Sequence, residues 1–147
     1  MTRSILFVCL GNICRSPTAE AIFRVQAQGR GLLIDSAGTS GWHDGKPSDP
    51  RASAEARRRG IDMSYIRSRK VIREDFERFD LIVGMDTQNM ADLRAIQPAG
   101  SRARLVKLLD YAPELGITDV PDPYFEDNFP EVLDMIDIAC SHLLESL

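Results

Sequence analysis

Four short apolar runs alternate with segments of helical spacing along the chain. Residues 4–10 form the first run, and others follow at 32–34, 80–85 and 103–109. Continuous apolar runs of this length are typical of strands buried on both faces of a parallel sheet. Because strand and helix alternate throughout, the pattern predicts an α/β single domain with an open, four-stranded, mostly parallel sheet and helices on both faces.

Between the apolar runs, the sequence contains signals for the starts of helices. Ser16-Pro17 and Asp49-Pro50 each predict a helix start, because Ser and Asp suit the N-cap and Pro suits the first helical position. Asp86 is the expected cap of a third helix. A last helix is predicted from apolar residues at i, i+3, i+4 and i+7 spacing, namely Val132, Met135, Ile136, Ala139, Leu143 and Leu144.

The composition is that of an ordinary globular domain. Hydrophobic residues make up 44% and charged residues 27% of the 147 residues, and the formal net charge is −4. This acidic balance disfavours a nucleic-acid partner. No apolar stretch approaches the ~18 residues of a membrane span, and Met1-Thr-Arg-Ser leads straight into the first strand pattern without a long apolar region of the kind that a signal peptide has. We therefore expect a cytoplasmic protein that does not bind membranes, and we further expect a monomer.

The segment CLGNICRS joins the first predicted strand to the first predicted helix. In open α/β sheets, ligands bind beyond the carboxyl ends of the strands. A loop that enters a helix N-terminus there directs backbone N–H groups and the helix dipole toward an anion. That field would stabilise the thiolate of Cys9, the form that acts as a nucleophile. Arg15 supplies a planar fork of donors suited to two phosphate oxygens.

The residues between these two complete the predicted phosphate-binding loop. Gly11 permits close backbone approach, and Asn12 tolerates a left-handed conformation. Ser16 can cap the helix and also donate to the Cys9 sulfur. Cys14 is either a small core residue or a partner that captures oxidised Cys9 as a disulfide. The candidate phosphate-binding residues are Leu10, Gly11, Asn12, Ile13, Cys14 and Ser16.

The stretch FVCLGNICRSPTAE resembles low-molecular-weight protein tyrosine phosphatases. The resemblance continues in the family's order through DSAGTSGWHDGKPSDPR, GMDTQNM and VPDPYFE, and covers nearly the whole chain. It implies one phosphatase domain over residues 1–147, with Cys9 as nucleophile, Arg15 as phosphate clamp and Asp122 as general acid. The prolines on both sides of Asp122 support this role, because they hold its carboxylate in an extended loop.

By the same resemblance, the chain removes phosphate from a phosphotyrosine-containing protein or a small aryl phosphate. The reaction would pass through a phosphocysteine intermediate without a metal or cofactor. Trp42, Tyr124 and Phe125 are expected to line the substrate pocket with Ile13, although packing alone could explain Trp42 or Phe125. Family members that prefer phosphoarginine resemble this loop but carry threonine at the place of Ile13, and an apolar side chain suits an aromatic substrate better.

One position departs from the family's pattern. Members commonly have a histidine that braces the loop asparagine, and Ile66 stands at that position here. The bracing of Asn12 must then depend more on Ser16 and Ser36, and the loop could be less rigid.

The remaining cysteine and the histidines have simpler expected roles. Cys140 is predicted to pack in the core, on the apolar side of the last helix. His43 and His142 have no partner that the sequence identifies, and both are predicted to be surface residues.

Two other functions remain open at this point. An arsenate reductase shares the predicted fold and cysteine loop but passes oxidation along two further cysteines, and this chain has none between Cys14 and Cys140. A catalytically silent phosphate-binding protein would need neither a nucleophile nor an acid, so the presence of Cys9 and Asp122 argues against it.

Overall fold

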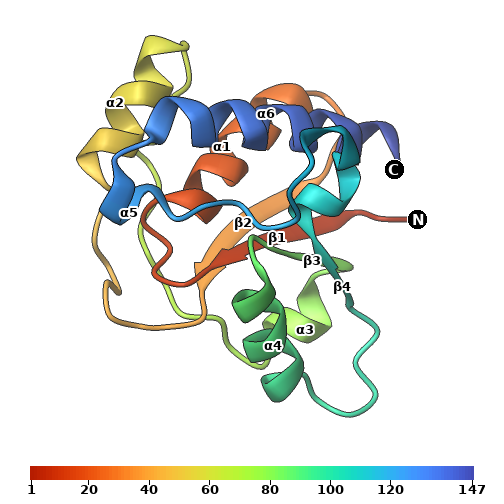
Figure 1. The fold of residues 1–147 in the computed structure, drawn as a ribbon. Coiled ribbons are helices and arrows are strands. Elements are labelled where there is room, and N and C mark those ends of the chain that lie inside the picture. Colours follow the sequence, from red (N-terminus) through yellow and green to blue (C-terminus); the bar gives the residue numbers. More distant parts are fainter.

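The sheet has four strands that all run parallel. The structure is a computed structural model that describes residues 1–147. The strands are β1 (Ser4–Cys9), β2 (Leu33–Gly38), β3 (Leu81–Gly84) and β4 (Arg104–Lys107), in the spatial order β2-β1-β3-β4 (Figure 1). The predicted fold class is confirmed, and the sheet is wholly parallel rather than mostly so.

Helices cover both faces of this sheet. The long helices α1 (Arg15–Gln26) and α6 (Phe129–Glu145) lie on one face, and α3 (Asp75–Arg78) and α4 (Thr87–Ile96) lie on the other (Figure 1). The helix α2 (Pro50–Arg58) contacts α1 and α6. Between β4 and α6 the chain forms two 3₁₀ turns, Leu108–Tyr111 and Pro113–Leu115, and the single-turn helix α5 (Pro123–Glu126).

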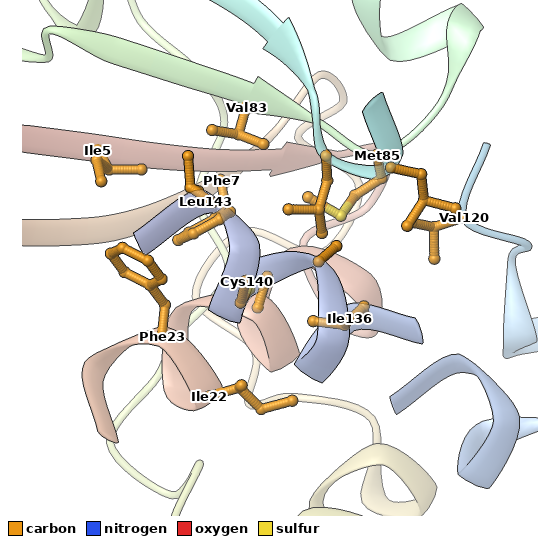
Figure 2. Close-up of a cluster of buried hydrophobic side chains, with 14 of the residues drawn as sticks. Ile5, Phe7, Ile22, Phe23, Val83, Met85, Val120, Ile136, Cys140 and Leu143 are labelled. Atoms are coloured by element: carbon orange, nitrogen blue, oxygen red, sulfur yellow. The ribbon is translucent and has the colours of Figure 1, made fainter. Parts of the chain in front are cut away.

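The central strand β1 explains the two-sided core, because alternate residues of a strand point to opposite faces. Ile5 and Phe7 belong to the cluster beneath α1 and α6, where Phe7 meets Phe23 edge to face with ring centroids 5.5 Å apart (Figure 2). Leu6 and Val8 belong to a second cluster on the α3 and α4 side. The strand is buried along its whole length, as its continuous apolar run predicts.

Cys140 is fully buried in the first cluster, as predicted (Figure 2). Burial raises the pKa of its thiol, so the group stays protonated and packs as a small apolar side chain. The Asp49 and Asp86 caps are also confirmed: Asp49 accepts from the backbone N–H of Arg51, and Asp86 forms a capping box with Asn89.

The start of α1 differs from the prediction. The helix begins at Arg15 after Cys14, and no side chain caps its N-terminus. Ser16 therefore lies inside the first turn rather than at the N-cap. Its hydroxyl contacts Cys9 and Asn12 instead, so this polar side chain belongs to the phosphate-binding loop and not to the helix end.

The second strand is longer than predicted and starts one residue later. It continues through Asp35 and Ser36 to Gly38, and each of its residues pairs with a residue of β1. Polar side chains interrupt the apolar run here, but Ser36 is buried by partners from other segments. The third and fourth strands are shorter than the runs at 80–85 and 103–109. Every helix of the structure is too short or too polar to cross a membrane.

Candidate active site

The predicted site residues gather in one pocket at the carboxyl end of the sheet. Cys9 is the last residue of β1, and Arg15 begins the helix that follows. Asp122 reaches the same edge from the segment between β4 and α6, far away in sequence. The pocket is lined by Cys9, Leu10, Gly11, Ile13, Cys14, Arg15, Trp42, His43, Asp122, Tyr124 and Phe125.

The loop after β1 folds back around the Cys9 sulfur. Asn12 has a φ of 56°, the left-handed conformation that its side chain tolerates better than most. This turn directs the backbone N–H of Asn12 toward the Cys9 Sγ, at 3.3 Å. The Ser16 Oγ lies 3.0 Å from the same sulfur. Two polar groups therefore face the sulfur from within the protein.

Asn12 is almost completely buried and uses both ends of its side chain. Its Nδ2 donates to the Oγ atoms of Ser16, at 2.7 Å, and Ser36, at 3.1 Å. Its Oδ1 accepts from the backbone N–H of Arg69, at 3.1 Å. Ile66 is buried in an apolar cluster with Cys14 and takes no part in these hydrogen bonds. Backbone and hydroxyl groups thus surround Asn12 in this chain.

Arg15 is held by two acceptors on one nitrogen. Its Nη1 donates to the Asp86 Oδ2, at 2.7 Å, and to the backbone carbonyl of Val120, at 3.0 Å. Burial by itself would lower the pKa of Arg15, but the nearby charges of Cys9 and Asp86 raise it overall, so the guanidinium stays charged. Its Nε and Nη2 have no hydrogen bond within the protein and are free to bind an oxyanion.

Asp122 lines the pocket near Arg15 and is partly exposed. Its Oδ2 lies 3.7 Å from the Arg15 Nη2, with the Asp122 side chain 36% exposed. Its Oδ1 accepts from the backbone N–H of Tyr124, at 3.1 Å, so the carboxylate is the N-cap of α5. Its backbone is extended, as the flanking prolines predict.

The outer part of the pocket is aromatic. Trp42 is 77% and Phe125 is 85% exposed, so neither is explained by core packing. Tyr124 and Phe125 meet edge to face with ring centroids 5.0 Å apart. The guanidinium of Arg51 lies 5.4 Å from the centre of the Tyr124 ring and donates to the Tyr124 carbonyl, at 3.1 Å. Arg51 thereby connects the start of α2 to this aromatic wall.

Cys14 is buried at the inner side of the pocket and packs with apolar residues of α1, α2 and α6. Burial raises the pKa of its thiol, and the nearby charges of Asp49 and Cys9 raise it further. This environment suits a packing residue that stays protonated. Its role as a redox partner of Cys9 stays a prediction.

Several residues of the site were not found from the sequence. His43, expected on the surface, lines the pocket beside Gly11, where an added Cβ would lie 3.1 Å from the His43 ring. Asp86 was expected only as a helix cap, and Arg51 was not singled out. His142 does lie on the surface but has a partner, because its Nε2 is 2.7 Å from the Glu114 Oε2.

The sequence matches the family of low molecular weight phosphotyrosine protein phosphatases over residues 4–147. The chain belongs to this family. It is 44% identical to the low molecular weight protein-tyrosine-phosphatase YfkJ of Bacillus subtilis over 98% of this chain and 95% of YfkJ. It is 39% identical to the human low molecular weight phosphotyrosine protein phosphatase, with coverage of 98% and 95%.

Solved structures of the family have the same fold. The crystal structure of YfkJ superimposes with a TM-score of 0.92 at 43% identity and covers 99% of this chain and 94% of YfkJ. A Drosophila arginine phosphatase also superimposes, with a TM-score of 0.90 at 29% identity and coverage of 99% and 97%.

Like its relatives, this low molecular weight phosphatase is a cysteine-dependent enzyme with protein tyrosine phosphatase activity. The family match and these full-length relatives support phosphatase activity rather than arsenate reduction or silent phosphate binding.

Proposed function

We propose that Cys9, Arg15 and Asp122 carry out phosphotyrosine hydrolysis through a phosphocysteine intermediate. The observation that supports this assignment is the meeting of a sulfur, a guanidinium and a carboxyl group in one pocket whose outer wall is aromatic. Each group then has one task. The thiolate attacks phosphorus, the guanidinium binds the phosphoryl oxygens, and the carboxyl group transfers the proton.

The first step forms the phosphorus–sulfur bond. The Cys9 thiolate attacks in line while the bond from phosphorus to the phenolic oxygen breaks, and Asp122 donates its proton to that oxygen. The loop N–H groups and the free Nε and Nη2 of Arg15 hold the equatorial oxygens as their negative charge is redistributed. Because Asp86 and Val120 occupy Nη1, the guanidinium is already aimed when the substrate arrives.

The second step releases phosphate. Asp122, now ionised, takes a proton from a water molecule that attacks the phosphocysteine, and the thiolate of Cys9 leaves. The contact between Ser16 Oγ and Cys9 Sγ supports this departure, since a hydroxyl donor stabilises the thiolate.

The pocket favours an aryl phosphate as substrate. Trp42, Tyr124 and Phe125 line the pocket together with the apolar side chain of Ile13, and this apolar lining suits a phenyl ring. A phosphotyrosine-containing protein or a small aryl phosphate is the substrate we propose, because Ile13 stands where family members that prefer phosphoarginine carry threonine. We further propose that the enzyme acts as a monomer in the cytoplasm, where its three free cysteines stay reduced.

Cys9→Ser tests the assignment directly. We expect turnover of an aryl phosphate to fall to background, while inorganic phosphate still binds, because the loop amides and Arg15 remain. Acid-quenched wild-type enzyme should carry phosphate on Cys9, and the variant should carry none. Cys140→Ala is the matched control: it removes another buried thiol, outside the pocket, and should keep turnover and the trapped intermediate. Hydrolysis retained in Cys9→Ser would exclude Cys9 as the nucleophile.

A further inference from the structure

Glu20 is a buried acidic residue on α1 that none of the steps above uses. Its side chain is 3% exposed, and a buried carboxylate requires hydrogen-bond or charge partners. The Ser36 hydroxyl donates to its Oε1 at 2.6 Å, and the Arg24 Nε donates to its Oε2 at 3.0 Å. Arg24 also donates to the backbone carbonyl of Ile34, so both partners of Glu20 are anchored on β2.

The partners of Asn12 fix which atoms donate and which accept in its hydrogen bonds. Its Oδ1 accepts from the backbone N–H of Arg69, so the other end of the amide, with two hydrogens, must face Ser16 and Ser36. Both serine oxygens therefore accept from Asn12. Each hydroxyl hydrogen is left to be donated elsewhere.

Glu20 determines where the Ser36 hydrogen goes. A carboxylate only accepts, so Ser36 donates to it and keeps its lone pairs directed at Asn12. At the other end of the network, Ser16 has accepted from Asn12 and has one hydrogen left, with the Cys9 Sγ at 3.0 Å and the Ala37 carbonyl at 3.3 Å as acceptors. The series Glu20, Ser36, Asn12, Ser16 and Cys9 is thus continuous.

Arg24 is the charged partner that supports the carboxylate form of Glu20, with its Nε 3.0 Å from the Glu20 Oε2. Burial raises the pKa of Glu20 overall, and the hydrogen bonds from Ser36 and Arg24 offset only part of that rise. Asp35 and Tyr65 are the other titratable groups that face it, and the Arg24 guanidinium lies 5.5 Å from the centre of the Tyr65 ring. Residues of α1, of β2 and of the segment around Tyr65 therefore surround the Glu20 carboxyl group.

We propose that Glu20 is a positioning residue for the phosphatase reaction. Its carboxylate orients the Ser36 hydroxyl, which holds Asn12 so that the Ser16 hydroxyl donates to the sulfur of Cys9. The inference rests on the proposed role of Cys9 and assigns a function to a residue 11 positions further along the chain. In a chain with Ile66 beside the loop, this acidic residue supplies an anchor for Asn12 from the α1 side.

Glu20→Gln is the first test, because it keeps the shape of the side chain. A glutamine that turns its oxygen to Ser36 faces Arg24 with an NH₂ group, and one that turns its NH₂ to Ser36 leaves the serine hydroxyl without its acceptor. We expect kcat to fall about tenfold with KM within about twofold, since one buried hydrogen bond is weakened and the groups that bind phosphate remain. Alkylation of Cys9 by iodoacetamide at fixed pH should slow by a similar factor.

Glu55→Gln is the matched control. Glu55 lies on α2 and is 9% exposed. Like Glu20 it accepts two side-chain hydrogen bonds, in its case from Arg58 and Arg59, but it has no hydrogen bond to the phosphate-binding loop. Its substitution should leave kcat and the alkylation rate of Cys9 unchanged. An equal loss in both variants would mean that buried glutamates matter only for general stability and would overturn the proposal.

A double-substitution cycle with Ser36→Ala tests the connection itself. If Glu20 acts through Ser36, Glu20→Gln should cause no further loss of kcat in the Ser36→Ala background. The mechanism would be refuted if the fold losses of kcat in the two single variants multiplied in the double variant. It would also be refuted if Glu20→Gln had a normal kcat and a normal alkylation rate of Cys9. If Glu20→Gln does not fold, Ser36→Ala alone carries the test, and a normal kcat in that variant overturns the proposal. Failure here with Cys9→Ser inactive would leave the nucleophile assignment intact.

Discussion

Asp122→Asn and Asp122→Ala remove the same carboxyl group but leave different local structure behind. The Asp122 Oδ1 caps α5 by accepting from the Tyr124 N–H at 3.1 Å. Asparagine is as good an N-cap as aspartate, whereas alanine loses about 1 kcal/mol at such a position. The asparagine variant therefore keeps the loop in place and removes only the proton donor.

The expected magnitudes separate the two effects. General acid catalysis contributes roughly 10²–10⁴ in rate, or about 3–5 kcal/mol of barrier. The cap accounts for about 1 kcal/mol, or roughly a factor of five. The contact between Asp122 and Arg15, 3.7 Å long and open to solvent on the Asp122 side, contributes little to substrate binding. Both variants should thus lose kcat by at least about 10² for phosphotyrosine-like substrates and keep KM nearly unchanged.

Single-turnover hydrolysis of aryl phosphates with graded leaving groups is the decisive assay. A tyrosine-like phenol has a pKa of about 10 and needs protonation as it departs, while much more acidic phenols depart readily as anions. The loss in Asp122→Asn should shrink steadily as the leaving group becomes more acidic. Single-turnover conditions isolate this step from hydrolysis of the intermediate, in which the same residue acts as a base.

Asp119→Asn is the control for this experiment. Asp119 is close in sequence but accepts from Lys107 at 2.9 Å and from Thr87, outside the pocket. Its substitution should change the rate by no more than a few-fold. A uniform loss across the leaving-group series in Asp122→Asn would show that Asp122 holds the substrate or the loop rather than donating a proton.

Two further substitutions test the shape and the redox chemistry of the pocket. Gly38→Ala would place a Cβ 2.7 Å from the Leu10 carbonyl oxygen, so we expect about 1–3 kcal/mol lower stability in denaturant unfolding and roughly 10²-fold lower kcat/KM from displacement of the loop. Wild-type stability and activity would contradict this. Peroxide should inactivate the enzyme reversibly, as Cys14 condenses with a Cys9 sulfenic acid to form a disulfide and water, and Cys14→Ser should recover less well on reduction. Peptide mapping without a Cys9–Cys14 linkage would disprove the protective role.

The fold was largely predictable because its signals are local. Continuous apolar runs and helix caps indicate buried strands and helix starts within a few residues, and they identified all four strands and the two aspartate caps. The part of β2 that was missed, residues 35–38, has the opposite character. Asp35 and Ser36 are polar, and partners from distant segments stabilise them there: Arg69 binds the half-buried Asp35, and Glu20 of α1 accepts from the buried Ser36.

The site was predictable only in part, for a related reason. The phosphate-binding loop is contiguous, so Cys9 and Arg15 could be found from their spacing. Asp86 meets Arg15 across 71 residues, and Glu20 meets Ser36 through packing of a helix on a strand. Nothing in the local sequence distinguishes a buried glutamate such as Glu20 from an exposed one, because its environment is made by distant segments.

The way Arg15 is held also has a consequence for the order in which the enzyme becomes active. Cys9 and Arg15 are made early in synthesis, but the acceptors that fix the guanidinium come from Asp86 and from Val120, late in the chain. Non-local contacts of this kind form late in folding. A nascent chain therefore carries its reactive thiol without a finished phosphate site, and dephosphorylation begins only when the C-terminal segment has docked.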